Sequence, residues 1–372
     1  MKILKDLWWI FLGYAIFLGL YESALTLDRW MRPLEPDSKV TISISIPRGT
    51  GLTEIARLLE DEGVIASHRA LVILALWKGT AGKIQAGEYL FSPAQSVSQI
   101  LDDLVAGNVL RHIVMIPEGF TMFDIARLME EAGLVSQDSF LLATRDRRLL
   151  DDLRIPAESA EGYLFPDTYA FTRDVTAESI VRTMVGRFWE IWQEEDFARL
   201  AEERAICAQE AVTLASIVEK EAAVSEERPL IASVFWNRLQ KSMPLQADPT
   251  VTYGILAEGN AAPERITTSL LRRPTPYNTY LVKGLPHGPI SNPGRDSLRA
   301  VLNPARTSYL YFVSKKNRRH HFSSTLQEHN QAVWRYLKKP MDEAKPESDT
   351  SREDKGVDPP SFEEKTASEA AK

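Results

Sequence analysis

Apolar and polar positions in the first third of the chain follow patterns that predict short strands and helices. Residues 40–46 alternate apolar and hydroxyl side chains with a period of two, which is typical of a half-buried strand. Residues 52–59 place apolar side chains at helical spacing, and Gly63 then supplies a C-terminal stop. Similar patterns predict a strand at 87–91 and a short amphipathic helix at 97–105. This region is therefore expected to be α+β.

The strand-and-helix pattern occurs twice. Residues 46–49, Ile-Pro-x-Gly, match residues 116–119, and residues 55–58, Ile-Ala-Arg-Leu, match residues 125–128 at the same offset of 70 positions. A constant offset without gaps indicates an internal duplication. The start of each copy is similar to a LysM repeat, a module that binds cell-wall glycan. The duplicated region therefore either binds glycan or only packs against the next domain.

Helices are expected to dominate the middle of the chain, and loops the region after it. Apolar stripes predict three helices, at about 176–204, 209–223 and 226–241. Residues 243–304 are dense in Pro, Gly and Asn, and long irregular stretches inside a compact domain are usually functional. The pattern then predicts two strands, at 309–313 and 321–323, which are joined by a basic turn at 315–319.

The N-terminus predicts a membrane anchor. Residues 7–21 carry no charge, and with Glu22 and residues 23–27 they form a stretch of about 20 residues, enough to cross a hydrocarbon core of about 30 Å. Basic residues lie on both sides, so the charge bias for a cytoplasmic N-terminus is weak. We expect an uncleaved transmembrane anchor. A cleaved signal peptide is the alternative, although no small-x-small cleavage site follows the apolar run.

Composition and charge exclude several classes of protein. The net charge is −7, and ten acidic and five basic residues within 341–372 account for −5 of it. The rest is close to neutral and shows no footprint for nucleic acid. The single cysteine, Cys207, has apolar neighbours and is expected to be buried and inert. Without a Cys/His ligand spacing for zinc we expect no metal, and we expect no cofactor.

These observations divide the chain into four expected parts with an overall α+β fold. Residues 1–38 are expected to form a cytoplasmic stub, transmembrane anchor and spacer, and residues 39–150 a duplicated LysM-like α+β module. Residues 151–339 are expected to form a larger α+β catalytic domain, and residues 340–372 an acidic disordered tail.

Two glutamates on the predicted helix near residue 220 are candidates for a general acid. Thr213, Ser216 and Lys220 occupy one polar wedge, so Glu219 and Glu221 fall on buried or half-buried flanks. Burial raises a carboxyl pKa, and a general acid needs this at neutral pH. Glu219 has the smaller neighbours, which leave room for a substrate, so it is preferred over Glu221. The alternative is that either glutamate lies at the surface or pairs with an arginine such as Arg228.

Loops rich in aromatic, amide and hydroxyl side chains suit an uncharged ring-shaped ligand. Aromatic faces stack on sugar rings, and carboxylates accept hydrogen bonds from hydroxyls. Loop architecture alone could also require the same Pro and Gly residues. Esterase, phosphate-loop and zinc-protease motifs are absent from the sequence. The candidate substrate-binding residues are Glu161, Tyr163, Phe165, Asp167, Tyr169, Ser216, Gln246, Asp248, Thr250, Tyr277, Asn278, Ser291 and Asn292.

Taken together, these segments resemble the YceG-like family of endolytic murein transglycosylases. The similarity runs from the anchor to about Val333, and its densest motifs are 161–169, 215–221, 245–254, 277–280 and 284–294. The resemblance implies a LysM-like first domain and Glu219 as the catalytic residue. It also implies a single-pass inner-membrane protein with a periplasmic body, acting on peptidoglycan strands, with penicillin-binding proteins as candidate partners. The chain departs from the family at His287, where proline is common, and at Arg318 and Arg319, where glycines are usual.

The implied reaction cleaves the bond between N-acetylmuramic acid and N-acetylglucosamine without consuming water. Glu219 would protonate the departing oxygen and then accept the proton of the muramic C6 hydroxyl as that oxygen attacks C1, which leaves a 1,6-anhydro end. Two alternatives remain open. One is a hydrolytic muramidase in which a second carboxylate, such as Glu161 or Asp167, positions water. The other is a non-enzymatic scaffold that binds the cell wall.

Overall fold

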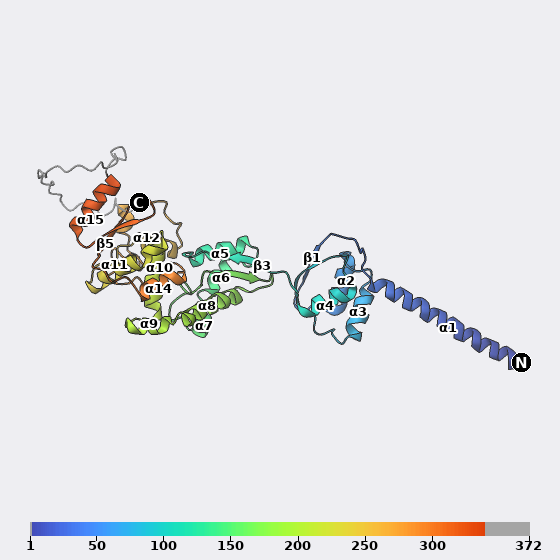
Figure 1. Cartoon of the computed structure of the whole chain (residues 1–372). Helices are drawn as coiled ribbons and strands as arrows, with labels where there is room; N and C mark the ends of the chain where they lie inside the picture. The colour runs from blue at the N-terminus through green and yellow to red at the C-terminus, as the bar shows by residue number, and fades with distance from the viewer. Residues whose placement is uncertain (1, 339–372) are drawn as a thin grey trace. The chain divides into compact units, whose positions relative to one another are not determined.

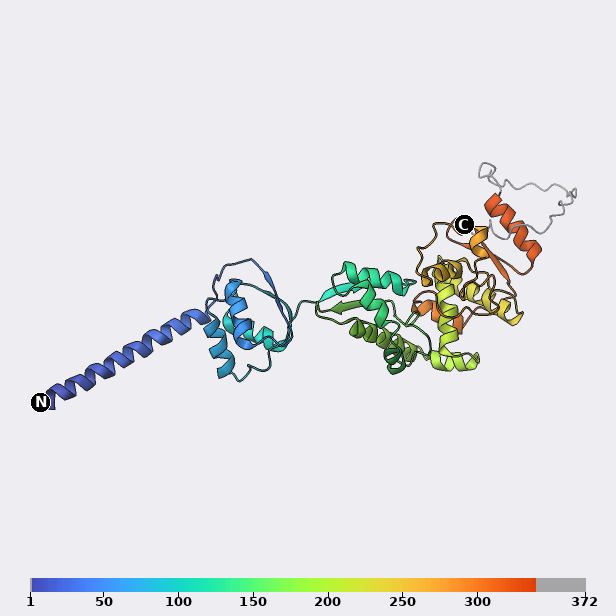
Figure 2. The same ribbon diagram turned by 180° about the vertical axis from the view of Figure 1, so that it is seen from behind.

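The computed structural model describes residues 2–338, apart from the side chains of residues 2–7 and 10. The chain divides into two compact units (Figure 1, Figure 2). Both contain helices and short two-stranded sheets, so the predicted α+β fold is confirmed. The first unit comprises Met1–Val114, Ala132–Leu134 and Tyr169–Thr176, and the second comprises Met115–Glu131, Val135–Thr168 and Ala177–Lys372.

The first unit contains a strand–helix–helix–strand arrangement followed by a further helix. Ile44 pairs with Tyr89 across an antiparallel two-stranded sheet. Ile44 and Ile46 are buried while Ser43 is exposed, as the period of two predicts. The elements are α1 (Lys2–Met31), β1 (Ile42–Ile46), α2 (Leu52–Asp61), α3 (His68–Trp77), β2 (Gly87–Phe91) and α4 (Val97–Ala106).

The two copies of the sequence repeat adopt the same local structure. Strand β3 (His112–Met115) and helix α5 (Met122–Glu131) each begin 70 residues after β1 and α2. The glycines that follow the two helices, Gly63 and Gly133, both have positive φ, of 70° and 67°. The duplication is therefore visible in the structure. The likeness of each copy to a LysM repeat stays a prediction.

The C-terminal end of helix α1 packs against the core of the first unit through Trp30 and Met31. The predicted membrane span begins at Leu7, whose side chain lies outside the described part. Among the residues that the structure does describe, no helix is both long enough and apolar enough to cross a membrane. The structure therefore does not confirm the predicted anchor.

Helix α10 forms the centre of the second unit and packs against α11, α12 and α14 (Figure 1). Its residues from Ala211 to Val218 are all buried. The elements of this unit are α5, α6 (Gln137–Ala143), α7 (Arg147–Asp152), α8 (Ala177–Glu194), α9 (Phe197–Glu203), α10 (Ala208–Glu221), η1 (Ser225–Glu227), α11 (Arg228–Gln240), α12 (Asp248–Ala257), α13 (Thr268–Leu271), α14 (Arg295–Leu302), β5 (Tyr311–Ser314), β6 (His320–Ser323), α15 (Leu326–Val333) and η2 (Trp334–Lys338). Strand β4 (Thr168–Phe171) pairs with β3, and most residues of both strands belong to the first unit.

Several details differ from the patterns in the sequence. The helix expected at 176–204 is two helices, because Asp196 adopts a left-handed conformation between α8 and α9 with φ of 52°. The region expected to be loop-rich contains three helices, of which α12 carries Pro249 in its first turn, where proline is tolerated. The expectation for Cys207 is wrong: this residue is exposed because it caps the start of α10.

The expected domain boundary at residue 150 stays a prediction. One division between the compact units falls between Val114 and Met115, so the second copy of the repeat belongs mostly to the second unit. Two long-range hydrogen bonds accompany this placement: the backbone N–H of Met122 donates to Glu161, and the carbonyl of Phe120 accepts from Nδ2 of Asn292. The predicted disordered tail, 340–372, lies outside the described residues.

Candidate active site

The last turn of α10 carries Glu219 and Glu221. Two positions along an α-helix correspond to a rotation of about 200°, so the two side chains leave the helix on nearly opposite sides. Each carboxyl group therefore meets a different set of neighbours.

Glu219 is an ion-paired carboxylate. Its Oε1 accepts a hydrogen bond from Nη2 of Arg228 at 2.9 Å, and its Oε2 accepts one from the backbone N–H of Gly294 at 3.0 Å. The Glu219 side chain is only 5% exposed. This arrangement matches the alternative in which a glutamate pairs with Arg228, and both carboxylate oxygens have a donor.

Glu118 is a functional candidate that the sequence motifs missed. Its Oε2 lies 3.2 Å from Nη2 of Arg228, the same atom that binds Glu219. Burial and the negative charge of Glu219 raise the pKa of Glu118, and the positive charge of Arg228 opposes the shift. The sequence repeat could have drawn attention to Glu118, because the two copies differ at this position: the first copy has Arg48 where the second has Glu118. A side chain at Gly294 would clash with the Glu118 carboxylate.

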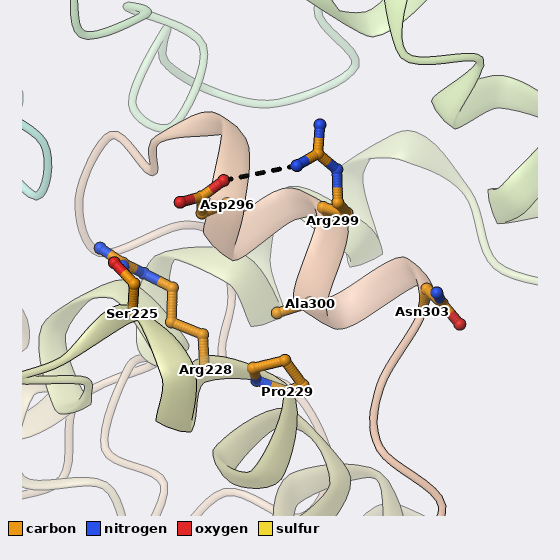
Figure 3. A pocket seen from close by; sticks show the side chains of 7 residues that line it. All are labelled: Ser225, Arg228, Pro229, Asp296, Arg299, Ala300 and Asn303. Atoms are coloured by element: carbon orange, nitrogen blue, oxygen red, sulfur yellow. Dashed lines mark hydrogen bonds and ion pairs between the residues drawn. The ribbon is translucent and has the colours of Figure 1, made fainter. Parts of the chain in front are cut away.

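A small cavity of about 210 Å³ is lined in part by Arg228 (Figure 3). Asp296 and Arg299 form an ion pair of 3.6 Å at its rim. Neither Glu219 nor Glu221 lines it, so we do not assign it to the candidate site. Its lining residues are Ser225, Arg228, Pro229, Asp296, Arg299, Ala300 and Asn303.

Glu221 has a different environment. Its side chain is half-buried, and among the described residues its carboxyl group has no hydrogen-bond or ion-pair partner. Burial and the negative charge of Asp248 raise the pKa of Glu221 to about 8, and the positive charge of Arg238 opposes the shift. These surroundings favour the protonated form of Glu221 over the charged form.

The neighbours of Glu221 are held in place by their own contacts. The hydroxyl of Tyr280 donates to Oδ1 of Asp248 at 2.6 Å, and burial raises the pKa of Asp248. Arg238 is 8% exposed, and its Nε and Nη1 donate to the backbone carbonyls of Leu310 and Leu245 at 2.7 and 2.8 Å. Glu221, a second carboxyl group and a buried cation are therefore brought together from α10, α12 and α11.

Three of the predicted substrate-binding residues lie where a ligand could contact them. Gln246 is exposed, adopts a φ of 51°, and places its Oε1 3.5 Å from Nη1 of Arg238. Asp248 is half-buried beside the acid. Tyr277 is half-buried and packs edge-on against Tyr253 and His287 at ring distances of 4.8 and 5.9 Å.

Glu161, in contrast, is buried and accepts hydrogen bonds from three separate segments of the chain. It is 1% exposed and accepts hydrogen bonds from the backbone N–H of Met122, the hydroxyl of Tyr253 and Nδ2 of Asn292, at 2.9, 2.9 and 2.8 Å. Burial raises its pKa to about 7 although these donors favour the charged form. A carboxyl group enclosed in this way is not placed to position water for hydrolysis. Its role is to join segments that lie far apart in the sequence.

The other predicted binding residues are also placed in the interior or in ion pairs. The aromatic side chains of Tyr163, Phe165 and Tyr169 are 0%, 6% and 7% exposed, so their faces pack in the protein instead of against sugar. Asp167 pairs with Nε of Arg187 at 2.9 Å. In the described structure these four side chains therefore contact other parts of the protein and are not exposed as a surface for sugar rings.

Buried polar residues near α10 hold the loops in position. Ser216 donates from its hydroxyl to the carbonyl of Thr213 at 2.7 Å and accepts from the backbone N–H of Ile290 at 3.0 Å. Oδ1 of Asn292 accepts from the backbone N–H groups of Gly162 and Leu164. The predicted binding residues that are fully buried and bonded in this way are Ser216, Thr250, Asn278, Ser291 and Asn292.

The fold and this site define a class of protein when they are compared with known proteins. The model of the YceG-like family matches residues 44–335, so this chain belongs to the YceG-like family. A crystal structure of a putative YceG-like protein from Listeria monocytogenes aligns with a TM-score of 0.55 and 32% identity, and the alignment covers 79% of this chain and 100% of that one.

Two murein transglycosylases are similar to most of this chain. The endolytic murein transglycosylase of Bacillus subtilis strain 168 is 33% identical over 326 residues, which cover 82% of this chain and 88% of the relative. The endolytic murein transglycosylase of Streptococcus pneumoniae strain D39 is 28% identical over 333 residues. That match covers 82% of this chain and 60% of the relative, so this chain spans only part of the pneumococcal protein.

Proposed function

We propose that this protein is an endolytic murein transglycosylase that cleaves the bond between N-acetylmuramic acid and N-acetylglucosamine in peptidoglycan strands. Membership of the YceG-like family and the names of the two relatives support the substrate and the reaction class. The observation that carries the chemistry is Glu221, a half-buried carboxyl group with a pKa of about 8 and no internal partner.

The proposal assigns the catalytic role to Glu221 instead of Glu219. A general acid must hold a proton at working pH and must be free to give it to the substrate. The assignment is supported by the difference in partners: Glu219 engages both of its oxygens with Arg228 and Gly294, whereas Glu221 has a raised pKa and no hydrogen-bond partner among the described residues. Glu219 then serves to fix the end of α10 through Arg228 and the Glu118 loop.

The reaction uses one residue twice. Glu221 donates its proton to the departing glycosidic oxygen, and the resulting carboxylate accepts the proton of the muramic C6 hydroxyl as the C6 oxygen attacks C1. No water is consumed, and Glu221 is protonated again at the end of the cycle. Arg238 stabilises the transient carboxylate, and Asp248 opposes its formation until the sugar carries positive charge.

A hydrolytic muramidase remains a second candidate because Asp248 lies beside Glu221 and could position water. A non-enzymatic scaffold is the third. Incubating the protein with uncrosslinked glycan strands and analysing the fragments by mass spectrometry separates all three. The proposal predicts 1,6-anhydro ends. Reducing ends without anhydro products would show a hydrolase, and binding without release of fragments would show a scaffold.

We also propose that α1 tethers the protein to the inner membrane, with the body in the periplasm beside the peptidoglycan synthases. Support comes from Trp8, Phe11, Phe17 and Leu20, whose side chains are 63%, 73%, 62% and 66% exposed. Exposed apolar surface of this kind needs an apolar partner. Cell fractionation tests the tether: the whole chain should sediment with membranes, and a chain that starts at Lys39 should stay in the supernatant. Equal distribution of the two would contradict it.

A further inference from the structure

A cluster of positive charge lies at the tip of the β5–β6 hairpin. This basic turn, residues 315–319, carries four cationic side chains. Arg319 approaches Glu226 at 3.9 Å, but both side chains are more than half exposed, and such pairs contribute little. The side chain of Lys316 has no partner among the described residues. The local charge is therefore mostly unbalanced.

The basic turn is fixed next to the candidate acid. Nη2 of Arg318 donates to the carbonyl of Ala223, two residues beyond Glu221, at 3.3 Å. At the end of the turn, the backbone N–H and Nδ1 of His320 contact the buried carboxylate of Glu227, at 3.0 and 2.7 Å. At the other end of the hairpin, Leu310 accepts the hydrogen bond from Arg238, which is the cation beside Glu221. Contacts at both ends therefore hold the turn at the edge of the site.

The folded structure engages these charges only weakly: Lys315 lies 6.0 Å from the ring centre of Tyr336, and Arg318 binds a backbone carbonyl instead of a carboxylate. Lys316 and Arg318 adopt left-handed backbone conformations, with φ of 62° and 64°. This conformation costs about 1 kcal/mol or more for residues with a side chain, and glycine avoids the cost. The neighbouring cations also act on His321, whose pKa is lowered by burial, by Lys315 and by Arg335. A positive field is thus maintained at a strained, exposed turn.

We propose that the basic turn binds the carboxylates of the stem peptides attached to the glycan strand. This inference rests on the proposed function. The stem peptide is joined to the muramic sugar, so a strand placed at Glu221 brings its carboxylates close to the turn. Arginine and lysine bind carboxylates through charge-assisted hydrogen bonds. The turn therefore makes the enzyme prefer strands that carry peptides over strands from which an amidase has removed them.

The test compares the substrate preference of two double variants. Arg318→Gly/Arg319→Gln removes two charges, and glycine suits the backbone of residue 318. The matched control is Arg265→Gln/Arg272→Gln, which removes two charges from exposed side chains that have no hydrogen-bond or ion-pair partner among the described residues. The measured quantity is the ratio of kcat/KM for peptide-bearing strands to kcat/KM for amidase-treated strands.

We expect the Arg318→Gly/Arg319→Gln variant to lower this ratio about tenfold, equivalent to about 1.4 kcal/mol, and the control to leave it unchanged. An unchanged ratio in the first variant, or an equal loss in the control, would overturn the proposal. If the Arg318→Gly/Arg319→Gln variant keeps the kcat/KM ratio but loses binding to vesicles with anionic headgroups, the turn binds a lipid surface instead of stem peptides.

The outcome can be separated from the proposed function. Retention of the two kinds of strand can be measured by co-sedimentation in a Glu221→Gln background, where no cleavage is needed. A preference for peptide-bearing strands that disappears with the arginines supports the turn even if the wild-type protein cleaves neither strand. Absence of any preference contradicts the turn whatever the cleavage activity is.

Discussion

Replacing Glu221 with glutamine is expected to reduce strand cleavage by a factor on the order of 10²–10⁴ or more, because general acid catalysis typically contributes this much. The substitution keeps the size of the side chain and removes the proton. The upper end of the range is expected because the same residue also acts as the base. Folding should be retained, since Glu221 has no hydrogen bond or ion pair to lose within the described residues.

The pH dependence of kcat/KM is the measurement that links this effect to the proton. Wild-type activity should fall as pH rises through about 8, because Glu221 then loses its proton. The same raised pKa means that Glu221 favours the folded state fully below the ordinary carboxyl pKa, and this contribution is lost as pH rises through about 8. Glu221→Gln should therefore melt no lower than wild type at pH 9. A folded variant with near wild-type turnover would refute the assignment.

Replacing Arg228 with methionine is expected to lower the free energy of unfolding by about 3–5 kcal/mol, since removing one partner of a buried pair leaves an uncompensated charge. Arg228 is 8% exposed and Glu219 is 5% exposed at the side chain, so water cannot replace the lost cation easily. Glu118 loses the same partner. Urea denaturation of the variant and the wild type measures the difference.

Two further variants control this prediction. The double variant Arg228→Met/Glu219→Gln removes the unpaired charge as well and should recover part of the lost stability. Arg187→Met breaks a more exposed pair with Asp167, with side chains 31% and 39% exposed, and should cost about 1 kcal/mol or less. Equal losses of unfolding free energy for Arg228→Met and Arg187→Met would contradict the role of the Glu219–Arg228 ion pair in fixing the end of α10.

Local pattern was sufficient to predict much of the fold. The alternation of Ile and Ser in residues 42–46 and the helical spacing after residue 52 reappear as β1 and α2, and the repeat locates β3 and α5. The boundary between units was not predictable in the same way. It depends on hydrogen bonds such as the one between Met122 and Glu161, which join positions 39 residues apart.

The helix that carries both candidate glutamates was predicted, but the partners of each glutamate could not be read from neighbours along the chain. The size of the flanking residues favoured Glu219. The decisive groups come from elsewhere: Arg228 lies on α11, Glu118 on the loop before α5, and Asp248 at the start of α12. Only the folded structure shows that one glutamate is paired and the other is not.

The loop motifs show the same limit for substrate contacts. Aromatic residues in a Gly- and Pro-containing segment suit stacking on sugars, yet Tyr163 is fully buried and packs against Phe188 at a ring distance of 4.9 Å. Asn292 and Glu161 looked like ligand-binding polar groups and instead bind each other. Burial of a loop residue depends on what packs over it, and the sequence does not state this.

The most direct test of the account is to compare the products of Glu219→Gln and Glu221→Gln on uncrosslinked glycan strands, with folding checked by circular dichroism. The account predicts that folded Glu219→Gln still forms 1,6-anhydro ends, at a rate within about tenfold of wild type, whereas Glu221→Gln forms essentially none. Formation of anhydro ends by Glu221→Gln, with none from folded Glu219→Gln, would show that the acid is the ion-paired glutamate and would contradict the account.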